Sequence, residues 1–303
     1  MNMWLVGAGY WGSKLKDSLA KIGVHADVID TKDGKTIDDI NSPAPVMLAT
    51  PLWQHYDQVL TLLNRGHDVY VEKPMAEHAL QVEHIQSELD DNQILMVGHL
   101  FVHHPQMTKI KQIIEAGTIG RVVHITSRRL NWGIYQTRTT PVLSLAVHDI
   151  SIILELCGPD CIVYDATGWQ QGERQQHDRV LFRGHANNIT FDVDVSWCWP
   201  TRVRETIVHG THGQIVWNQD DNTVVVTPYT IIDNRANKGE TLPVKYLYGE
   251  NIPDPLEHEL QHFIHCVKHR IVPSTGVDQA LAVAKVVDQV HTLLGSIPSA
   301  NPT

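Results

Sequence analysis

Residues 3–12 read M-W-L-V-G-A-G-Y-W-G, and this stretch predicts how the chain begins to fold. Four apolar residues predict a strand, and Gly7, Gly9 and Gly12 follow it at the G-x-G-x-x-G spacing of dinucleotide-binding turns. Gly7 permits the tight turn, Gly9 lets the backbone approach a pyrophosphate, and Gly12 lets the next helix pack close to the strand. The N-terminus of that helix would offer unpaired N–H groups and a positive dipole end to the phosphates.

An acidic residue follows the next predicted strand, where it can distinguish the two nicotinamide dinucleotides. Asp30 ends this strand about twenty residues after the first glycine of the turn. A carboxylate there accepts hydrogen bonds from the ribose hydroxyls of NAD and repels the 2′-phosphate of NADP. Lys32 weakens this preference without reversing it, so the sequence favours NAD over NADP.

Strands and helices alternate through the first 120 residues. Short, mostly β-branched runs predict strands that are buried on both faces, at residues 3–6, 26–29, 46–49, 69–71 and 94–97. Apolar residues at helical spacing lie between them, before Gly66 and again over residues 76–90. The alternation predicts an α/β fold whose N-terminal domain, residues 1–120, is a Rossmann domain with a doubly wound parallel sheet.

The pattern changes after Gly120. Further strands are predicted at residues 121–129, 180–182, 189–196, 204–208, 214–217 and 223–227. They predict a C-terminal α/β domain, residues 121–303, with an open and mostly antiparallel sheet. Two helices are predicted near the end of the chain, at residues 255–269 and 277–294, and we expect that they can pack back on the first domain. Because one face of this sheet lacks covering helices, we expect copies to associate through it as a homodimer or homotetramer.

Composition limits the partners. The formal net charge of −10 argues against nucleic acid, which binds basic patches, although a few Arg or Lys residues can still form a local anion site. No run of 18 apolar residues is present, so we expect no membrane span. The chain enters a predicted strand at once and its four cysteines form no zinc-like set, so we expect a cytoplasmic protein with free thiols.

The tetrapeptide Val71-Glu72-Lys73-Pro74 ends the fourth predicted strand. Ligands of open α/β sheets bind at the carboxyl ends of strands, so Lys73 is expected where a nicotinamide and a substrate meet. Its ammonium group can hydrogen-bond the reacting oxygen and stabilise developing negative charge. Taken alone, a single lysine is more often a solvated surface charge.

Several motifs follow one another along the chain. They are G-A-G-Y-W-G at 7–12, A-T-P-L-W-Q-H at 49–55, V-E-K-P at 71–74 and V-G-H at 97–99. Together they resemble the glucose–fructose oxidoreductase / inositol dehydrogenase / MocA (Gfo/Idh/MocA) family. N-W-G at 131–133 and L-A-V-H-D-I-S at 145–151 resemble the branch that acts on nucleotide-linked sugars. The resemblance implies an NAD-dependent oxidoreductase that transfers hydride between a sugar or nucleotide-sugar hydroxyl carbon and the nicotinamide.

The glycine turn and the resemblance together give the expected site residues. The cofactor set is Gly7, Gly9, Tyr10, Trp11, Gly12, Asp30, Thr50, Pro51, His55, Glu72 and Lys73. The substrate set is Lys73, His99, Arg129, Asn131, Ser144 and His148. By resemblance, Lys73 and His148 are the catalytic pair, in which the imidazole exchanges the hydroxyl proton because its pKa lies near working pH. Strand alternation sends Arg128 and Arg129 to opposite faces, so at most one of them faces the substrate.

Ser144 departs from the family pattern, because many members carry Asp four residues before the catalytic histidine. A carboxylate would orient and support the imidazolium, and losing such a group costs about 10⁴ in turnover in the serine protease triad. Asp149 follows His148 directly, so on a helix its side chain would point roughly 100° away from that of His148, and it would be a poor substitute for the missing carboxylate. Three hypotheses remain: the catalytic pair suffices, Tyr135 or Arg138 assists, or the protein is a catalytically impaired protein that binds NAD and a ligand.

A second motif suggests a different class of enzyme. His258-Glu259-Leu260-Gln261-His262 matches H-E-x-x-H, which gives a zinc metallopeptidase as a remote alternative. The chain has 19 histidines, so chance matches are frequent, and His265 and His269 merely continue the stripe. We therefore expect a helix face here and no bound metal.

Overall fold

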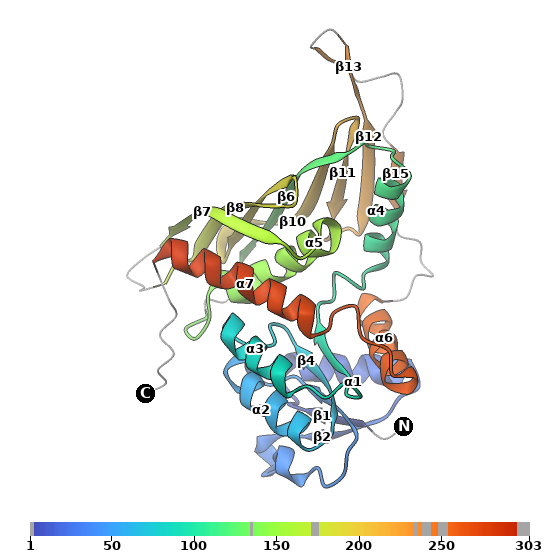
Figure 1. Cartoon of the computed structure of the whole chain (residues 1–303), viewed down its shortest axis with the longest axis vertical. Coiled ribbons are helices and arrows are strands. Elements are labelled where there is room, and N and C mark those ends of the chain that lie inside the picture. Colours follow the sequence, from blue (N-terminus) through green and yellow to red (C-terminus); the bar gives the residue numbers. More distant parts are fainter. Residues whose placement is uncertain are drawn as a thin grey trace. The chain divides into compact units, whose positions relative to one another are not determined.

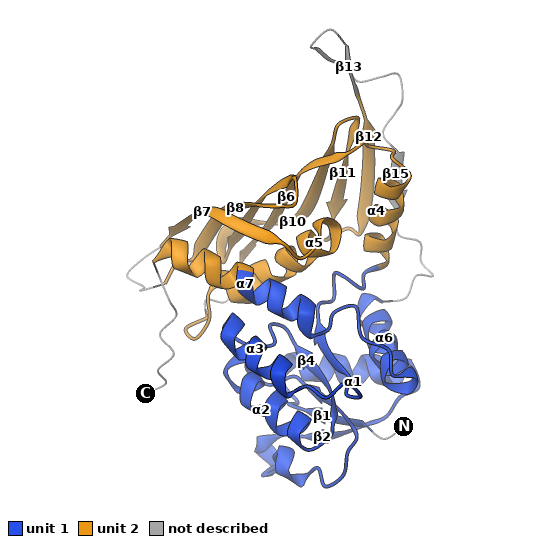
Figure 2. Ribbon diagram, viewed as in Figure 1, with its two compact units in different colours: residues 1–104, 253–285 blue, residues 105–252, 286–303 orange. Residues whose placement is uncertain are grey.

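The computed structural model describes residues 3–133, 136–170, 176–232, 235–237, 244–247 and 254–295. The chain forms two compact units, which Figure 2 shows in different colours. The first unit comprises residues 1–104 and 253–285, and the second comprises residues 105–252 and 286–303. Each unit is built around its own main sheet.

The first unit contains a parallel sheet with the strand order β2-β1-β3-β4-β5. Its strands are β1 Met3–Val6, β2 Ala26–Ile29, β3 Pro45–Leu48, β4 Asp68–Glu72 and β5 Leu95–Gly98. The helical elements are α1 Tyr10–Lys21, the 3₁₀ turns Thr31–Asp33 and Ile37–Asp39, α2 Leu52–Asn64, α3 Ala79–Glu88, α6 Pro255–His269 and the first part of α7 Val277–Leu294. The predicted doubly wound sheet is confirmed, and its strand order reverses between β1 and β3.

Both faces of this sheet are buried, as the apolar runs predict. In β4, Val69 and Val71 pack into one apolar cluster with α2 and α3, whereas Tyr70 packs into a second cluster with α1 and α6. The ring of Phe263 in α6 lies edge-on to Tyr70, with 5.7 Å between the ring centroids. A helix from near the end of the chain therefore completes the core of the N-terminal sheet.

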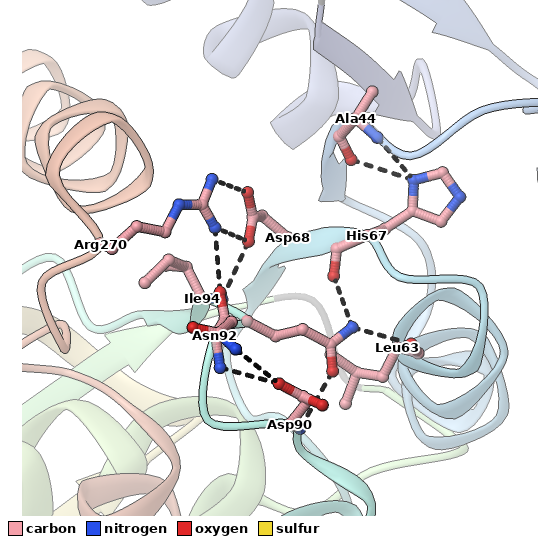
Figure 3. A network of polar contacts seen from close by, with 9 residues as sticks. Ala44, Leu63, His67, Asp68, Asp90, Asn92, Ile94 and Arg270 are labelled. Atoms are coloured by element: carbon pink, nitrogen blue, oxygen red, sulfur yellow. Dashed lines mark hydrogen bonds and ion pairs between the residues drawn. The ribbon is translucent and has the colours of Figure 1, made fainter.

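A polar network ties the end of α6 to the start of β4 (Figure 3). The Arg270 guanidinium donates to both carboxylate oxygens of Asp68, at 2.7 and 2.8 Å. Asp68 also accepts the backbone N–H of Ile94, and Arg270 donates to the carbonyl of Asn92. Since Asp68 is nearly buried, these donors replace the water that an exposed carboxylate would bind.

The second unit contains a sheet with the strand order β15-β12-β11-β10-β6-β9-β8-β7. Its strands are β6 Val122–Trp132, β7 Cys161–Trp169, β8 Arg179–Ala186, β9 Ile189–Ser196, β10 Cys198–Gly210, β11 Gly213–Asn218, β12 Thr223–Pro228 and β15 Val244–Leu247. Neighbouring strands are antiparallel except β6 and β9, which are parallel. A separate ribbon pairs β13 Thr230–Ile232 with β14 Arg235–Asn237. The open, mostly antiparallel sheet is confirmed.

Strand β7 was not among the predicted strands. Its register with β8 shifts between Val163 and Asp165. Such an irregularity moves the following side chains to the other face, so the period-two pattern that marks a strand is interrupted. Strands β8 and β10 also extend beyond the segments predicted at residues 180–182 and 204–208.

Helices cover one face of the second sheet (Figure 1). Helix α5 Val147–Cys157 packs against β6, β8 and β9, a π-helical turn Val142–Ala146 precedes it, and α4 Pro105–Glu115 lies in the same unit. The alternation predicted for Arg128 and Arg129 is correct: Arg129 is buried against α5, whereas Arg128 is exposed and pairs with Glu205. In the described part of the chain, no helix is both long and apolar enough to cross a membrane.

Candidate functional site

A cavity of about 470 Å³ lies where the strand order of the first sheet reverses. The ends of β1, β2 and β3 and the turns after them line it, including Gly7, Gly9, Asp30, Thr50 and Pro51. In doubly wound folds, the crevice at such a reversal is where nucleotides bind. The fold therefore brings together cofactor residues that were predicted from three separate stretches of sequence.

The glycine turn leaves room for nothing larger than hydrogen at two positions. Gly7 has a φ of +97°, and a Cβ there would lie 2.7 Å from the carbonyl oxygen of Ala49. A Cβ at Gly12 would lie 1.9 Å from the carbonyl oxygen of Gly7. Helix α1 begins after Gly9, with no side chain capping its first N–H groups. This helix end is thus suited to an anionic ligand such as a pyrophosphate.

Asp30 joins the second strand to the glycine turn. Its carboxylate accepts the backbone N–H of Ala8 at 2.7 Å and that of Lys32 at 2.9 Å, one at each oxygen. These two N–H groups lower the pKa of Asp30, so the side chain is ionised at neutral pH. Each oxygen keeps a lone pair that a ribose hydroxyl can use. Lys32 and Lys35 line the same cavity.

His55 connects two turns that follow neighbouring strands of the first sheet. Its ring is 2% exposed, with Nδ1 2.8 Å from the carbonyl oxygen of Pro74 and Nε2 2.8 Å from that of Thr50. Burial lowers the pKa of His55, and a neutral ring donates to only one of the two carbonyls. The structure therefore gives His55 a role in holding the turn after β3 against the turn after β4.

Glu72 is buried at the end of β4 and is held from two sides. The indole N–H of Trp11 donates to its Oε1, and the hydroxyl of Tyr70 lies 3.2 Å from the same oxygen. Burial raises the pKa of Glu72 to about 7, against the opposing effects of Trp11 and the charge of Lys73. The Tyr70 hydroxyl also lies 3.1 Å from Oε2 of Glu259, so two carboxyl groups share one phenol.

Lys73 follows this buried carboxyl group, and its Lys73–Pro74 peptide bond is cis. Lys73 is partly exposed. His99, at the end of β5, is 1% exposed, and its Nδ1 has no hydrogen-bond partner among the described residues. Burial, together with the nearby charge of Lys73, lowers the pKa of His99 to about 3, so its ring is neutral. His99 thus lies close to the lysine, as expected, but inside the core.

The H-E-x-x-H motif lies on α6 and does not present a metal site. Glu259 is 1% exposed and its carboxyl group faces the phenol described above, so it cannot act as an accessible base. His258 Nδ1 lies 2.8 Å from the carbonyl oxygen of His103, and His262 Nε2 contacts Ser274. Across the described residues, no three His, Cys, Asp or Glu side chains are grouped for a metal ion. The geometry argues against the peptidase alternative.

The expected substrate residues of the second unit lie on α5, β6 and the turn before α5. His148 is in the first turn of α5 and is partly exposed. Ser144 lies in the π-helical turn, where its hydroxyl donates to the carbonyl of Thr140 at 2.9 Å and accepts the Trp197 indole N–H at 3.1 Å. Because the π-helix is wound more loosely, Ser144 and His148 are not simply one α-helical turn apart. Tyr135 lies outside the described residues.

Arg129 was expected to contact the substrate, and the structure corrects this expectation. The residue is 1% exposed, and its Nε and Nη2 donate to the Asp149 carboxylate at 2.9 and 3.0 Å. Its Nη2 also donates to Gln219. Alternation places Arg129 on the helix-covered face, where a carboxylate of α5 forms a buried ion pair with it. Asn131, two residues along the same face, is partly exposed and accepts from Arg204 Nη2 at 3.4 Å.

Two residues beside the candidate site were missed in the sequence. Tyr70 was treated as one more core residue of a strand, and Glu259 only as part of the zinc-like motif. Their contact spans 189 positions, which no local pattern can reveal. The burial of Glu259 could have been predicted from its position, because Glu259 falls at helical spacing between Leu256 and Phe263 on the apolar face of α6.

Family profiles match both units of the chain. Residues 11–99 match the oxidoreductase family profile described as an NAD-binding Rossmann fold. Residues 107–216 match the profile of the GFO/IDH/MocA C-terminal domain. The prediction that the N-terminal sheet binds NAD is confirmed by the first match.

Curated relatives are similar over parts of the chain. An inositol 2-dehydrogenase/D-chiro-inositol 3-dehydrogenase of Lactiplantibacillus plantarum is 27% identical over 178 residues, which cover 49% of this chain and 50% of that protein. This chain therefore spans only about half of that relative's length. An oxidoreductase of Formosa agariphila is 30% identical over 270 residues, covering 80% of this chain and 77% of the relative.

Solved structures share the whole fold. The UDP-N-acetylglucosamine 3-dehydrogenase of Acidithiobacillus ferrooxidans superposes with a TM-score of 0.83 at 16% identity, covering 97% of both chains. A levoglucosan dehydrogenase in complex with NADH and levoglucosan gives a TM-score of 0.83 at 17% identity, again over 97% of both chains. At this identity the likeness establishes the fold. Taken with the profile matches and the glycine turn, these findings show that the chain belongs to the Gfo/Idh/MocA family of oxidoreductases.

Proposed function

We propose that this protein is an NAD-dependent dehydrogenase or reductase acting on a ring hydroxyl carbon of a sugar, free or nucleotide-linked. The observation that carries the proposal is the cavity in which the uncapped end of α1 and the ionised Asp30 meet. The first binds phosphates and the second binds a ribose. The dehydrogenases of inositol, levoglucosan and a nucleotide sugar among the relatives support a CH–OH substrate.

In the proposed reaction, the hydroxyl carbon loses a hydride and its oxygen loses a proton, which leaves a carbonyl group. NAD, when bound, supplies the acceptor for the hydride. His148 takes the hydroxyl proton as a general base and returns it in the reverse direction. Lys73 donates a hydrogen bond to the same oxygen and stabilises the negative charge that develops there. Glu72, held by Trp11, fixes the turn that carries Lys73.

The proposal divides the work between the two units. We assign cofactor binding to the first unit, to which residues 253–285 also belong, and we assign substrate binding and association with other copies to the second unit. The sheet face opposite α5 supports this association, because it carries the exposed Trp132 and Trp169. Four free cysteines, three of them buried, are consistent with a reducing compartment, and we place the protein in the cytoplasm.

The decisive experiment measures NADH formation with a panel of inositols, free sugars and nucleotide sugars. Lys73→Met should lower turnover about 10²–10³-fold, the cost of losing a donor to a developing oxyanion. Because Lys73 also belongs to the expected cofactor set, binding of NADH, followed by fluorescence, should weaken in this variant by far less than turnover falls. Lys16→Met removes an exposed lysine of α1 and serves as the matched control. Full turnover in Lys73→Met would refute the assigned role.

A second function, binding of NAD and a ligand without efficient turnover, rests on Ser144. Its hydroxyl already donates to the Thr140 carbonyl, and it supplies no charge to an imidazole. If a missing carboxylate limits the enzyme, Ser144→Asp should raise turnover about tenfold, well within the roughly 10⁴ attributed to such a group. Ser144→Asn, with a similar shape and no charge, is the control. Equal rates for the two variants would show that charge at this position is not limiting.

A further inference from the structure

Two arginine side chains lie side by side on the helix-covered face of the second sheet. Arg129 on β6 and Arg204 on β10 are directly opposite each other in the antiparallel register. Residues opposite each other on antiparallel strands share a face, and like charges at such positions destabilise the sheet. The two charges repel each other less when an anion neutralises one of them.

One of the two charges is neutralised inside the protein. Asp149 accepts two hydrogen bonds from Arg129 and a third from Ser127, at 2.7 Å. The carboxylate is 0% exposed, and those three donors occupy both of its oxygens. Asp149 therefore has little capacity left for the second guanidinium.

Among the described residues, no carboxylate forms a hydrogen bond or ion pair with the second guanidinium, that of Arg204. Arg204 Nε is buried without a hydrogen-bond partner among the described residues, and Nη2 makes a single long bond, to Asn131. The nearby carboxylate of Asp220 is already held by Arg202, at 2.7–2.8 Å. Burial, followed by the charges of Arg129 and Arg202, lowers the pKa of Arg204 to about 10, so the group is still charged at neutral pH.

We propose that Arg204, with Asn131 beside it, is the binding site for an anionic group of the substrate, a phosphate or a carboxylate. The inference rests on the proposed function and deepens it. Arg204 is partly exposed, so its terminal nitrogens can be reached. A planar guanidinium binds both kinds of anion through two parallel hydrogen bonds. The site lies on the face that α5 covers, and the first turn of α5 carries His148.

The first test measures anion binding without turnover. Inorganic phosphate is titrated against thermal unfolding at constant ionic strength, with NADH present to occupy the glycine turn. The wild-type protein should be stabilised in a saturable way. Arg204→Met should weaken the apparent phosphate affinity about tenfold or more, the expected loss for one charge-assisted pair. Arg183→Met, which removes an exposed arginine of β8 that pairs with Asp165, should bind phosphate as the wild type does.

The variant also reports on its own folding. Because Arg204→Met removes a like-charge contact, it should be at least as stable as the wild type without phosphate, so lost binding cannot be attributed to unfolding. Unchanged phosphate affinity in Arg204→Met overturns the proposal, and so does an equal loss in Arg183→Met.

The second test distinguishes the two sources of the anion. Turnover is compared for UDP-N-acetylglucosamine, glucuronate and glucose, which present phosphates, a carboxylate and no charge. Arg204→Met should raise KM about tenfold for the anionic substrate used, with little change in kcat, and should leave glucose unaffected. An equal effect on all three substrates contradicts the proposal. If no member of the wider panel of inositols, free sugars and nucleotide sugars is turned over, the proposed function fails, while the phosphate titration still decides whether the anion site exists.

Discussion

Asp30 illustrates how one side chain can serve both folding and recognition. Its carboxylate fastens the glycine turn through Ala8 and begins the 3₁₀ turn at Lys32, and it keeps lone pairs free on the cavity side. The pKa of Asp30 is lowered by these N–H groups, so its contribution is constant at neutral pH and declines only in acid. The proposed recognition of the ribose and the closure of the turn thus depend on the same negative charge.

Removing this charge should weaken NAD binding specifically. Asp30→Asn keeps the size of the side chain but loses the anionic acceptor, so we expect the Kd for NADH to rise about tenfold, and the preference over NADPH to shrink. Fluorescence titration with both cofactors measures this. Asp33→Asn, at an exposed acid in the adjacent turn, is the control. An unchanged ratio of NADH to NADPH affinity would show that Asp30 does not read the ribose.

The buried carboxyl groups around Tyr70 should make stability depend on pH. Burial raises the pKa of Glu72 to about 7 and that of Glu259 well above its ordinary value. The folded state therefore binds more protons than the unfolded state above about pH 4.5, and the free energy of unfolding falls as the pH rises from there to about 7 and beyond. The free-energy cost of ionising these buried carboxyl groups is absent below the pKa of the unfolded state, about 4.5, and it grows as the pH rises to about 7 and beyond.

Glu259→Gln tests this assignment. A carboxamide resembles the protonated acid and needs no proton, so the variant should lose less stability than the wild type between pH 5 and 8. Urea unfolding at several pH values measures the slope. Glu115→Gln, at an exposed position of α4, should leave the slope unchanged. A slope identical in wild type and Glu259→Gln would mean that Glu259 is not the titrating group.

Helix α6 shows how a remote element becomes part of the N-terminal core. Leu260 and Phe263 fill the cluster under the sheet, and Arg270, just past the helix end, binds the Asp68 carboxylate at the start of β4 (Figure 3). The apolar stripe supplies the free energy of burial, and the ion pair fixes where the helix ends. Sequence periodicity identifies such a helix but not the sheet on which it packs.

Breaking this attachment should cost stability rather than binding. Arg270→Ala leaves the nearly buried Asp68 without two donors, so we expect the free energy of unfolding to fall by about 1–3 kcal/mol. Arg65→Ala disrupts an exposed pair with Asp38 and should cost less than about 1 kcal/mol. Chemical denaturation of both variants provides the comparison. If both variants lost the same free energy of unfolding, the burial of Asp68 would not increase the contribution of its ion pair to stability.

The open face of the second sheet carries the proposed association of copies. Trp132 on β6 is 63% exposed and Trp169 on β7 is 44% exposed, on a face that otherwise carries ion pairs such as Arg179 with Asp194. Large aromatic side chains surrounded by charges are typical of the buried centre of an interface.

Light scattering during size-exclusion chromatography should give the mass of a dimer or tetramer. Trp132→Glu should shift the distribution toward the monomer, because it buries a charge at the proposed interface. Trp53→Glu, at a 48% exposed tryptophan of α2 in the other unit, should not. A monomeric wild-type protein would contradict the association.

The local patterns of this sequence were enough to predict most of its helices and strands and the residues that line the cavity of the first unit. Local sequence is enough to identify several site residues, because the steric limits of a turn and the end of a strand depend on only a few neighbouring residues. These residues are Gly7, Gly12, Asp30, Glu72 and Lys73. Residues farther apart were harder to place. Arg129 looks like a substrate contact until Asp149, twenty positions away, is seen to neutralise it. Strand β7 was missed because its register shift interrupts the alternation of apolar and polar residues by which a strand is recognised in a sequence.

What the amino-acid sequence determined by itself is the α/β class, the strand–turn–helix that binds a dinucleotide, and the family of oxidoreductases. Backbone sterics at glycines and the periodicity of apolar residues depend only on neighbours along the chain. Only the tertiary structure determined which charges are available. It buried Glu259 beside Tyr70, paired Arg129 with Asp149, and left Arg204 with no carboxylate partner among the described residues, because desolvation and ion pairing depend on what surrounds a group in space.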